Sequence, residues 1–353
     1  MGVAVSLLGY IETPQENGIA GWCFGEDSDE PLRVEVSVNG IPLRTLVANM
    51  PRHDIEAQHG RRDVGFFFAI DPELAALFPE SCTIRFEIDG TPLRSGANRE
   101  GVDFKGGSED TSVLEARLAE GWTINKWGGL SRQFRHFPDL QKQYLEFYND
   151  LYNIVYNEYR IKLFMHYGSL LGYYRDAQLI PHDDDFDVSF VIYTDDLHAV
   201  ARAFYGLAAS LKAIAAETGM QISIQETGQM SIWRQELHID IFSTWMNSKR
   251  EIFTYFGVSG EWPDKQVALT EGGLLGHKVC VPVLTEELIT LTYGPHWKVP
   301  DPYFQWQVPA QTGVEMAKLR EIGKGYSGVD GLPADWKSLI DSSSTVSYAK
   351  DKP

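Results

Sequence analysis

The first hundred residues alternate apolar and polar side chains in short runs, which is the pattern of half-buried β-strands. The runs 34–38 and 84–88 both alternate, and each leads into a two-residue hairpin signal, Asn-Gly at 39–40 and Asp-Gly at 89–90. One residue after each turn the chain continues with the same Pro-Leu-Arg. A solenoid would repeat such a unit several times. A hairpin pattern that occurs only twice in the sequence therefore indicates two hairpins of one small domain.

We therefore predict that residues 1–100 form a small all-β sandwich. Gly21-Trp22 and the Gly-Phe-Phe-Phe run at 65–68 supply further strand material. The ring of Trp22 can stack on a sugar, but a tryptophan in such a pattern more often belongs to the core. We accordingly favour a stabilising or spacer role for this domain over carbohydrate binding.

The regular pattern is lost after this domain. Residues 101–135 contain Gly-Gly pairs at 106–107 and 128–129 and a short helical stretch near 114–118. Segments rich in glycine and without sustained periodicity are typical of connections. We interpret residues 101–135 as a linker.

A second domain is predicted over residues 136–325, followed by a lightly structured tail over 326–353. It begins with a helix from Pro138 to Tyr159, in which aromatic and aliphatic residues recur at helical spacing. The later elements are predicted in this order: strand 161–167, strand 186–192, helix 197–218 closed by Gly219, strands 221–225, 230–234 and 237–242, a strand ending at Pro282, and helix 286–291.

A short polar motif separates the strand over 161–167 from the next helix. Gly168-Ser169 is predicted to form a turn there, which would expose backbone N–H groups. The N-terminus of a helix favours an anion such as phosphate. We therefore expect Gly168 and Ser169 to bind phosphate oxygens.

Four aspartates, at positions 183, 184, 185 and 187, lead into the strand that follows. Residues two apart in a strand share a face, so Asp185 and Asp187 are expected to point the same way. Two adjacent carboxylates repel unless a positive charge lies between them, and a hard divalent cation with oxygen ligands is the usual solution. A lone Asp-x-Asp is more often a solvated turn or a helix cap. The preceding strand, turn and helix favour the metal site here.

Composition and charge restrict the ligands. The chain has 353 residues, enough for two domains, with 43% hydrophobic and 23% charged residues, which is ordinary for a soluble globular protein. The net charge of −18 argues against binding nucleic acid. A nucleotide stays open as a ligand, because a metal can supply the positive charge.

The cysteines and apolar runs give an expected location. The three cysteines, Cys23, Cys82 and Cys280, are far apart, and we expect free, mostly buried thiols in a reducing compartment. No apolar run in the sequence approaches the ~20 residues of a membrane span. The N-terminus lacks a basic region before its short apolar stretch, so no secretory signal is predicted.

Taken in order, these residues resemble the LicD family. The resemblance rests on Gly-Ser-Leu-Leu-Gly at 168–172, Arg175, Ile-Pro at 180–181, Asp-Asp-Asp-Phe-Asp at 183–187, and a closing Tyr-Gly…Trp…Pro segment at 293–300. The family contains bacterial phosphocholine transferases and fukutin-type ribitol-phosphate transferases, within the nucleotidyltransferase superfamily. His182 departs from the family pattern, which has an aromatic residue there, usually tryptophan. The departure concerns acceptor or leaving-group contacts and not the metal pair.

The resemblance implies an α+β fold: a nucleotidyltransferase-like mixed sheet with helices, preceded here by the small all-β sandwich. The sandwich is similar to accessory β-domains of bacterial polysaccharide-assembly transferases. By resemblance, Asp240, on the strand over 237–242, is the third carboxylate, and the alternative is an edge-strand aspartate that faces solvent. Asp185, Asp187 and Asp240 would bind one or two Mg²⁺ (or Mn²⁺) ions.

The same resemblance gives roles to other residues. Asp240 or Asp183 would deprotonate the acceptor hydroxyl. Gly168, Ser169 and Arg175, with Lys278 as a weaker candidate, would bind the donor phosphates. Arg175 can grip a phosphate with two hydrogen bonds, or it can form a salt bridge with the acidic cluster.

The implied reaction moves phosphocholine or an alditol phosphate from a CDP-linked donor to a hydroxyl of a cell-surface glycan, as in capsule or lipopolysaccharide synthesis, and releases CMP. One alternative is nucleotidyl transfer, in which attack falls on the α-phosphate and pyrophosphate is released. Another is a catalytically silent glycan-binding module, against which the three retained carboxylates argue. The expected location is the bacterial cytoplasm, with any membrane association made through partners. The expected partners are further domains or other polysaccharide-assembly proteins.

Overall fold

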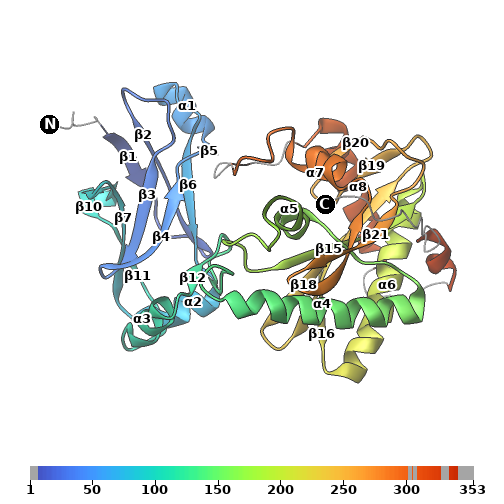
Figure 1. Ribbon diagram of the computed structural model, residues 1–353. Coiled ribbons are helices and arrows are strands. Elements are labelled where there is room, and N and C mark those ends of the chain that lie inside the picture. The colour runs from blue at the N-terminus through green and yellow to red at the C-terminus, as the bar shows by residue number, and fades with distance from the viewer. Residues whose placement is uncertain (1–6, 301–303, 305–307, 327–333, 341–353) are drawn as a thin grey trace. The chain divides into compact units, whose positions relative to one another are not determined.

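The computed structural model (Figure 1) describes residues 7–300, 304, 308–326 and 334–340. The chain divides into two compact units, Met1–His136 and Phe137–Pro353. The first is built mainly from β-strands, and the second combines helices with a mixed sheet. The predicted α+β class is confirmed.

Two larger sheets form the body of the first unit. One sheet has the strand order β1 (Leu7–Ile11), β2 (Gly18–Gly25), β6 (Asp63–Ala69) and β5 (Met50–Pro51). The other has the order β11 (Val102–Phe104), β7 (Cys82–Ile88), β3 (Arg33–Val38) and β4 (Ile41–Val47), with β8 (Thr91–Pro92) paired to β7. The smaller elements are α1 (His53–His59), α2 (Pro72–Leu77), β9 (Arg94–Ser95), η1 (Gly96–Asn98) and β10 (Arg99–Glu100).

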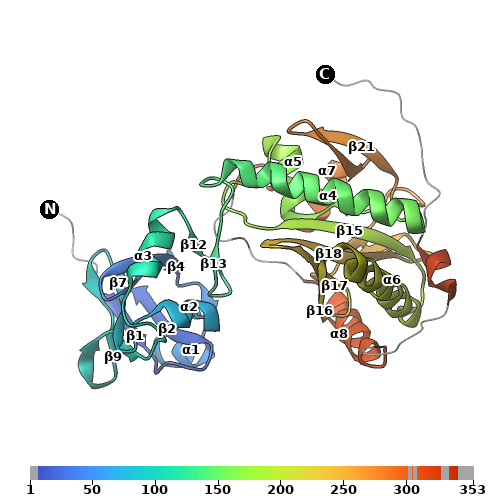
Figure 2. The same cartoon turned by 90° about the horizontal axis from the view of Figure 1, so that it is seen from below.

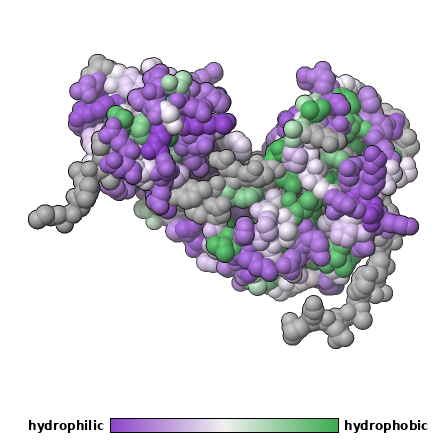
Figure 3. Space-filling view, turned by 90° about the horizontal axis from the view of Figure 1, so that it is seen from above, coloured by the Kyte–Doolittle hydropathy of each residue, from purple (hydrophilic) through white to green (hydrophobic). Residues whose placement is uncertain are grey.

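The two sheets share one hydrophobic core, as a sandwich does. Phe66 on β6 and Phe86 on β7 pack with ring centroids 5.6 Å apart. Trp22 is half-buried and stacks on Phe24, beside His59, so its ring contributes to packing. Hydrophilic side chains cover most of the face of this unit seen in Figure 3.

Residues 101–135, predicted to be a linker, belong to this unit instead. Strand β11 pairs with β7, and α3 (Ser112–Ala119) buries Leu114 completely in the sandwich core. Strands β12 (Thr123–Ile124) and β13 (Leu130–Ser131) form a small ribbon. Gly128 has a φ of +89°, and a Cβ atom there would lie 2.5 Å from the backbone of Ala69. The glycines that suggested a connection therefore allow close packing against the sandwich.

The second unit is built around one mixed sheet. Its strand order is β14 (Phe164–Met165), β15 (Phe186–Tyr193), β18 (Leu237–Met246), β17 (Gln229–Arg234) and β16 (Gln221–Glu226), with β19 (Glu251–Phe253) paired to β18 and β20 (Ser259–Glu261) to β19. Strands β15 and β18 are parallel, and the other pairs are antiparallel. Strands β21 (Leu269–Leu274) and β22 (His277–Pro282) form a separate hairpin.

Helices complete this unit: α4 (Pro138–Tyr159), α5 (Tyr167–Asp176), α6 (Leu197–Thr218), α7 (Thr285–Tyr293), α8 (Ala310–Lys324) and the short η2 (Ala334–Leu339). Figure 2 shows the sheet between α4 and α6. Strand β15 is buried along nearly its whole length, as expected of a central strand covered on both faces. The predicted strand over 161–167 is shorter than expected, because β14 pairs with β15 over two residues.

Helix α6 is long and apolar enough, by length and composition alone, to cross a membrane. Its apolar residues are largely buried in this unit, where the helix packs against the sheet, α8 and η2. The composition of α6 is thus that of a core helix.

Part of the segment predicted to be a lightly structured tail is packed. Trp336 in η2 is 5% exposed, and Ile340 forms a β-bridge with Ile192. Helix α6 has a glycine, Gly206, where it meets Trp336, and a Cβ atom at Gly206 would overlap the Trp336 ring. The remainder of the predicted tail after Tyr326, 327–333 and 341–353, lies outside the described residues.

We predict that Gly206→Ala destabilises the protein, although alanine is the better helix former. The added methyl group must displace the Trp336 ring, and such overpacking costs typically ~1–3 kcal/mol. Chemical denaturation measures the free energy of unfolding. In a Trp336→Ala background the clash is gone, so Gly206→Ala should become neutral or stabilising. Equal effects in both backgrounds would contradict this explanation.

Candidate active site

Three carboxylates are brought together at the start of two parallel strands. The register of β15 and β18 places Asp187 directly beside Asp240, and Asp185 lies just before β15. Each of the three offers an oxygen atom that lies within 4.8 Å of the others. Because equivalent positions in paired parallel strands project to the same face, this grouping follows from the strand register.

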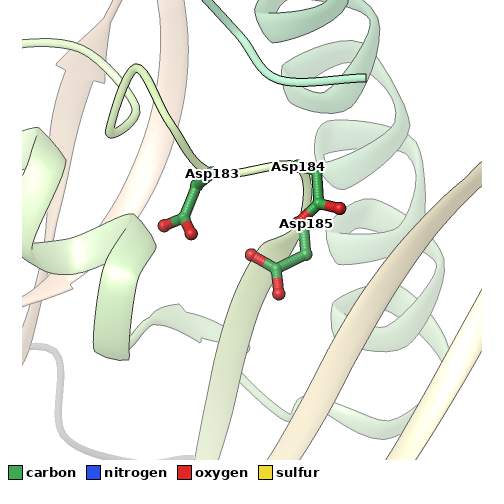
Figure 4. A group of neighbouring side chains, drawn as sticks. All are labelled: Asp183, Asp184 and Asp185. Atoms are coloured by element: carbon green, nitrogen blue, oxygen red, sulfur yellow. The ribbon is translucent and has the colours of Figure 1, made fainter. Parts of the chain in front are cut away.

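The acidic loop before β15 adds Asp183 and Asp184 to this cluster. The carboxylate oxygens of Asp183, Asp184 and Asp185 also come within 4.8 Å of one another. Figure 4 shows the carboxylates of Asp183 and Asp185 directed to one side of the loop and that of Asp184 to the other. Tyr144 of α4 donates a hydrogen bond of 2.9 Å to the Asp184 carbonyl oxygen, which ties the loop to the helix.

The sequence predicted that Gly168 and Ser169 form a turn before the helix. They lie instead in the first turn of α5. Helix α5 begins at Tyr167, whose φ of +42° is rare for a bulky residue and marks a strained entry to the helix. A Cβ atom at Gly168 would lie 2.5 Å from Asp183 Oδ2 and 3.6 Å from Asp187 Oδ2. A side chain at position 168 would therefore displace the Asp183 carboxylate from its place beside the helix N-terminus.

Ser169 is a positioning residue in this structure. Its Oγ atom accepts a hydrogen bond of 2.8 Å from the backbone N–H of Asp187. The backbone N–H of His166 in turn donates to the Asp187 carbonyl oxygen at 3.0 Å. Both contacts fix the backbone of Asp187 at the start of β15, and this sets the position from which its side chain projects. The N–H groups of a helix's first turn have no carbonyl partner within the helix, and the Asp183 carboxylate lies close to this end of α5.

Asp240 is held by side chains of the neighbouring strand. The register of β17 and β18 pairs Ser231 with Asp240, and the Ser231 hydroxyl donates to Asp240 Oδ1. Gln229 Nε2 donates to Asp240 Oδ2 at 3.4 Å. His238, which shares the face of Asp240 in the strand, stacks on Trp233 with ring centroids 4.4 Å apart. These contacts keep the Asp240 carboxylate in a fixed orientation.

His166 and Tyr293 are polar groups beside the carboxylates. His166 is 1% exposed, and its burial lowers its pKa to about 3, so the imidazole is neutral. Its Nδ1 atom lies 2.6 Å from Ser189 Oγ, while Nε2 has no hydrogen-bond partner among the described residues. Desolvation, reinforced by Asp187 and Asp183, raises the pKa of Tyr293 well above its usual value. Tyr293 is therefore a protonated phenol near the cluster.

The two predicted phosphate-binding cations are engaged elsewhere. The Arg175 guanidinium donates to the carboxylate of Asp176, with its shortest contact at 2.8 Å, and Nη1 donates to the Trp297 carbonyl oxygen at 3.5 Å. Its ion pair is thus with its sequence neighbour and not with the acidic cluster. Lys278 lies on β22 and pairs with Glu271 on β21 at 3.0 Å.

The donor set matches a hard divalent cation. Carboxylate oxygens are the ligands that Mg²⁺ and Mn²⁺ prefer, and they are supplied here by Asp187 and Asp240 on paired strands and by Asp185 just before β15. Asp187 is 9% exposed, and a buried carboxylate beside two others is costly without a compensating charge. The arrangement can therefore bind a divalent ion and, through it, a phosphate group.

Sequence reasoning gave no role to the side chains that orient these aspartates. Ser231 and Gln229 meet Asp240 through strand pairing, and Tyr144 meets the acidic loop from a helix 40 residues upstream. Such contacts depend on the tertiary fold. Tyr293 could have been found from the sequence, because it belongs to the Tyr-Gly…Trp…Pro segment that resembles the closing segment of the family.

Comparison with known protein families agrees with this geometry. Residues 160–282 match the family described as LicD/FKTN/FKRP, nucleotidyltransferase domain. None of the curated proteins compared with the chain matches it. The matched segment runs from the end of α4 to the end of β22 and contains all the clustered aspartates. Residues 160–282 are therefore a nucleotidyltransferase domain of the LicD/FKTN/FKRP family.

Proposed function

We propose that the second unit is a metal-dependent phosphotransferase. It transfers a phospho-alcohol, either phosphocholine or an alditol phosphate, from a CDP-linked donor to a hydroxyl of a cell-surface glycan and releases CMP. The observation that carries the proposal is the carboxylate triad of Asp185, Asp187 and Asp240 inside a LicD-type domain. The choice of CDP and of the alcohol rests on the family resemblance.

The triad would hold Mg²⁺ or Mn²⁺. When bound, the ion supplies positive charge that neutralises the donor pyrophosphate and stabilises the departing CMP. Asp187 and Asp240 are fixed by backbone and side-chain hydrogen bonds, so the donor would meet a preorganised set of oxygens.

The chain's own residues would handle the phosphate and the proton. The first-turn N–H groups of α5 and the Tyr293 phenol are hydrogen-bond donors suited to phosphate oxygens. The acceptor oxygen attacks the phosphorus that carries the alcohol, and the bond from that phosphorus to the oxygen of CMP breaks. The acceptor's proton goes to Asp183, which lies beside the triad, whereas both carboxylate oxygens of Asp240 already accept hydrogen bonds from Ser231 and Gln229.

The test is product analysis with the full chain, Mg²⁺, CDP-choline or a CDP-alditol, and a glycan acceptor. We expect release of CMP and a phospho-alcohol on the glycan, and at least about a hundredfold loss of rate for Asp185→Asn. Asp264→Asn, which changes an exposed aspartate outside the cluster, should retain activity. Pyrophosphate as the product would instead establish nucleotidyl transfer, and no turnover of any CDP donor would reject the proposal.

Asp187→Asn should leave the protein folded. Removing one of three close carboxylates relieves repulsion, so in the presence of a chelator the melting temperature should equal or exceed that of the wild type. Adding Mg²⁺ should raise the melting temperature of the wild type by mass action and raise that of the variant less. Thermal unfolding followed by circular dichroism measures both. A variant that unfolds where the wild type is folded would indicate a structural role for Asp187.

The variant Asp240→Asn distinguishes two roles of Asp240, that of a metal ligand and that of the base that accepts the acceptor's proton. The amide keeps one oxygen for a metal but cannot accept a proton. If Asp240 is a ligand, as we expect, excess Mg²⁺ or Mn²⁺ should recover part of the lost activity, because weakened binding yields to mass action. A loss of ~10²–10⁴-fold that metal saturation does not relieve would identify Asp240 as the base. Turnover as fast as the wild type without added metal would remove Asp240 from the site.

A further inference from the structure

A second site lies along α4, beside the β21–β22 hairpin. Figures 1 and 2 show the hairpin alongside the C-terminal half of the helix. Between them is a groove of about 540 Å³, within the range of small-molecule binding sites. The carboxylate cluster does not contribute to its lining. We call this feature the α4 groove.

Aromatic rings form one wall of the α4 groove. Tyr148, Tyr152 and Tyr156 follow one another at helical spacing, with successive ring centroids 5.8 Å apart. Tyr148 is buried at the base, while Tyr152 and Tyr156 are half-buried and nearly parallel, with an interplanar angle of 11°. Arg160 lies over the Tyr156 ring, 5.4 Å from its centroid, but both rings are only partly covered, so their exposed parts are available to a ligand.

Polar groups line the rest of the α4 groove. Asn149, Asn153 and Asn157 accompany the tyrosines at the same four-residue spacing, and Asn153 and Asn157 are exposed. Carboxamides both donate and accept hydrogen bonds. The opposite wall carries the Lys278–Glu271 ion pair, whose side chains are 76% and 64% exposed. At the base, burial raises the pKa of the Cys280 thiol to about 12, so it is a neutral group.

We propose that the α4 groove binds a glycan chain, which is the acceptor of the proposed transfer. A pyranose ring has an apolar C–H face that packs on tyrosine rings and a rim of hydroxyl groups that pairs with carboxamides. A lipid surface would need a larger apolar area than three tyrosines provide. The assignment of the glycan as acceptor rests on the proposed function, but its binding does not.

Helix α4 connects the α4 groove with the acidic loop. Tyr144, one turn before Tyr148, binds the carbonyl oxygen of Asp184. From Tyr144 to Tyr156 the helix extends about 18 Å, at 1.5 Å per residue. A monosaccharide cannot span this distance, whereas an oligosaccharide can. The groove would therefore hold a polymer so that a distant unit reaches the carboxylates.

The test is calorimetric titration of the full chain with oligosaccharides chosen from an immobilised glycan array, in neutral and in phosphorylated forms. We expect saturable binding to the wild type and roughly tenfold weaker binding to Tyr152→Ala and to Asn153→Ala. Tyr152→Phe keeps the ring and should bind as the wild type does. Tyr159→Ala is the matched control, because that ring lies on the same helix but packs on Trp336.

Binding and transfer can fail separately. Asp185→Asn should bind the oligosaccharide normally while losing transfer, and Tyr152→Ala should raise the KM for the glycan without changing the affinity for the CDP donor. The inference is overturned if no oligosaccharide binds the wild type, or if Tyr152→Ala and Tyr159→Ala weaken binding equally. Normal binding in a protein that turns over no CDP donor would reject the proposed function and leave the groove a glycan site.

Discussion

The parallel pairing of β15 with β18 is the constraint on which the candidate site depends. It places Asp187 beside Asp240 at the start of two strands, where a slip of one residue would turn one carboxylate to the opposite face. The apolar residues that flank each aspartate prevent such a slip, because they are fully buried. They are Phe186 and Val188 on β15, and Ile239 and Ile241 on β18. Core packing therefore fixes the geometry of a charged cluster that would separate if the strands were free.

Neighbouring elements hold Asp187 and Asp240 of the cluster through hydrogen bonds with uncharged groups. The backbone of Asp187 is bonded to Ser169 and His166, and the carboxylate of Asp240 is bonded to Ser231 and Gln229. All these partners are uncharged groups, with His166 kept neutral by burial. Arg175 pairs with Asp176. Hydrogen bonds with uncharged groups therefore hold these two aspartates in place, as expected of a preorganised site.

Sequence signals predicted elements well where the cause is local and less well where it is tertiary. Helix α6 has the predicted bounds, because Asp196 caps its N-terminus and Gly219, with a φ of +71°, ends it. Strand β14 is shorter than the apolar run that predicted it, because pairing with β15 sets its length. The segment 101–135 has no periodicity of its own and is folded by contacts such as the burial of Leu114. Strand alternation grouped Asp185 with Asp187, and the family resemblance added Asp240, because which strand lies beside β15 depends on the whole sheet.

Helix α4 shows how one element can serve stability and recognition together. Tyr144 and Tyr148 lie against Phe186 and form part of the core under the acidic loop. The same four-residue spacing advances about 40° around the helix at each step, since 3.6 residues complete a turn. By Tyr152 and Tyr156 the stripe has therefore left the core and become half-exposed. A single sequence pattern thus fixes the loop that carries the carboxylates and also builds the wall of the α4 groove, so the spacing between the two is set by a rigid helix and not by a loop.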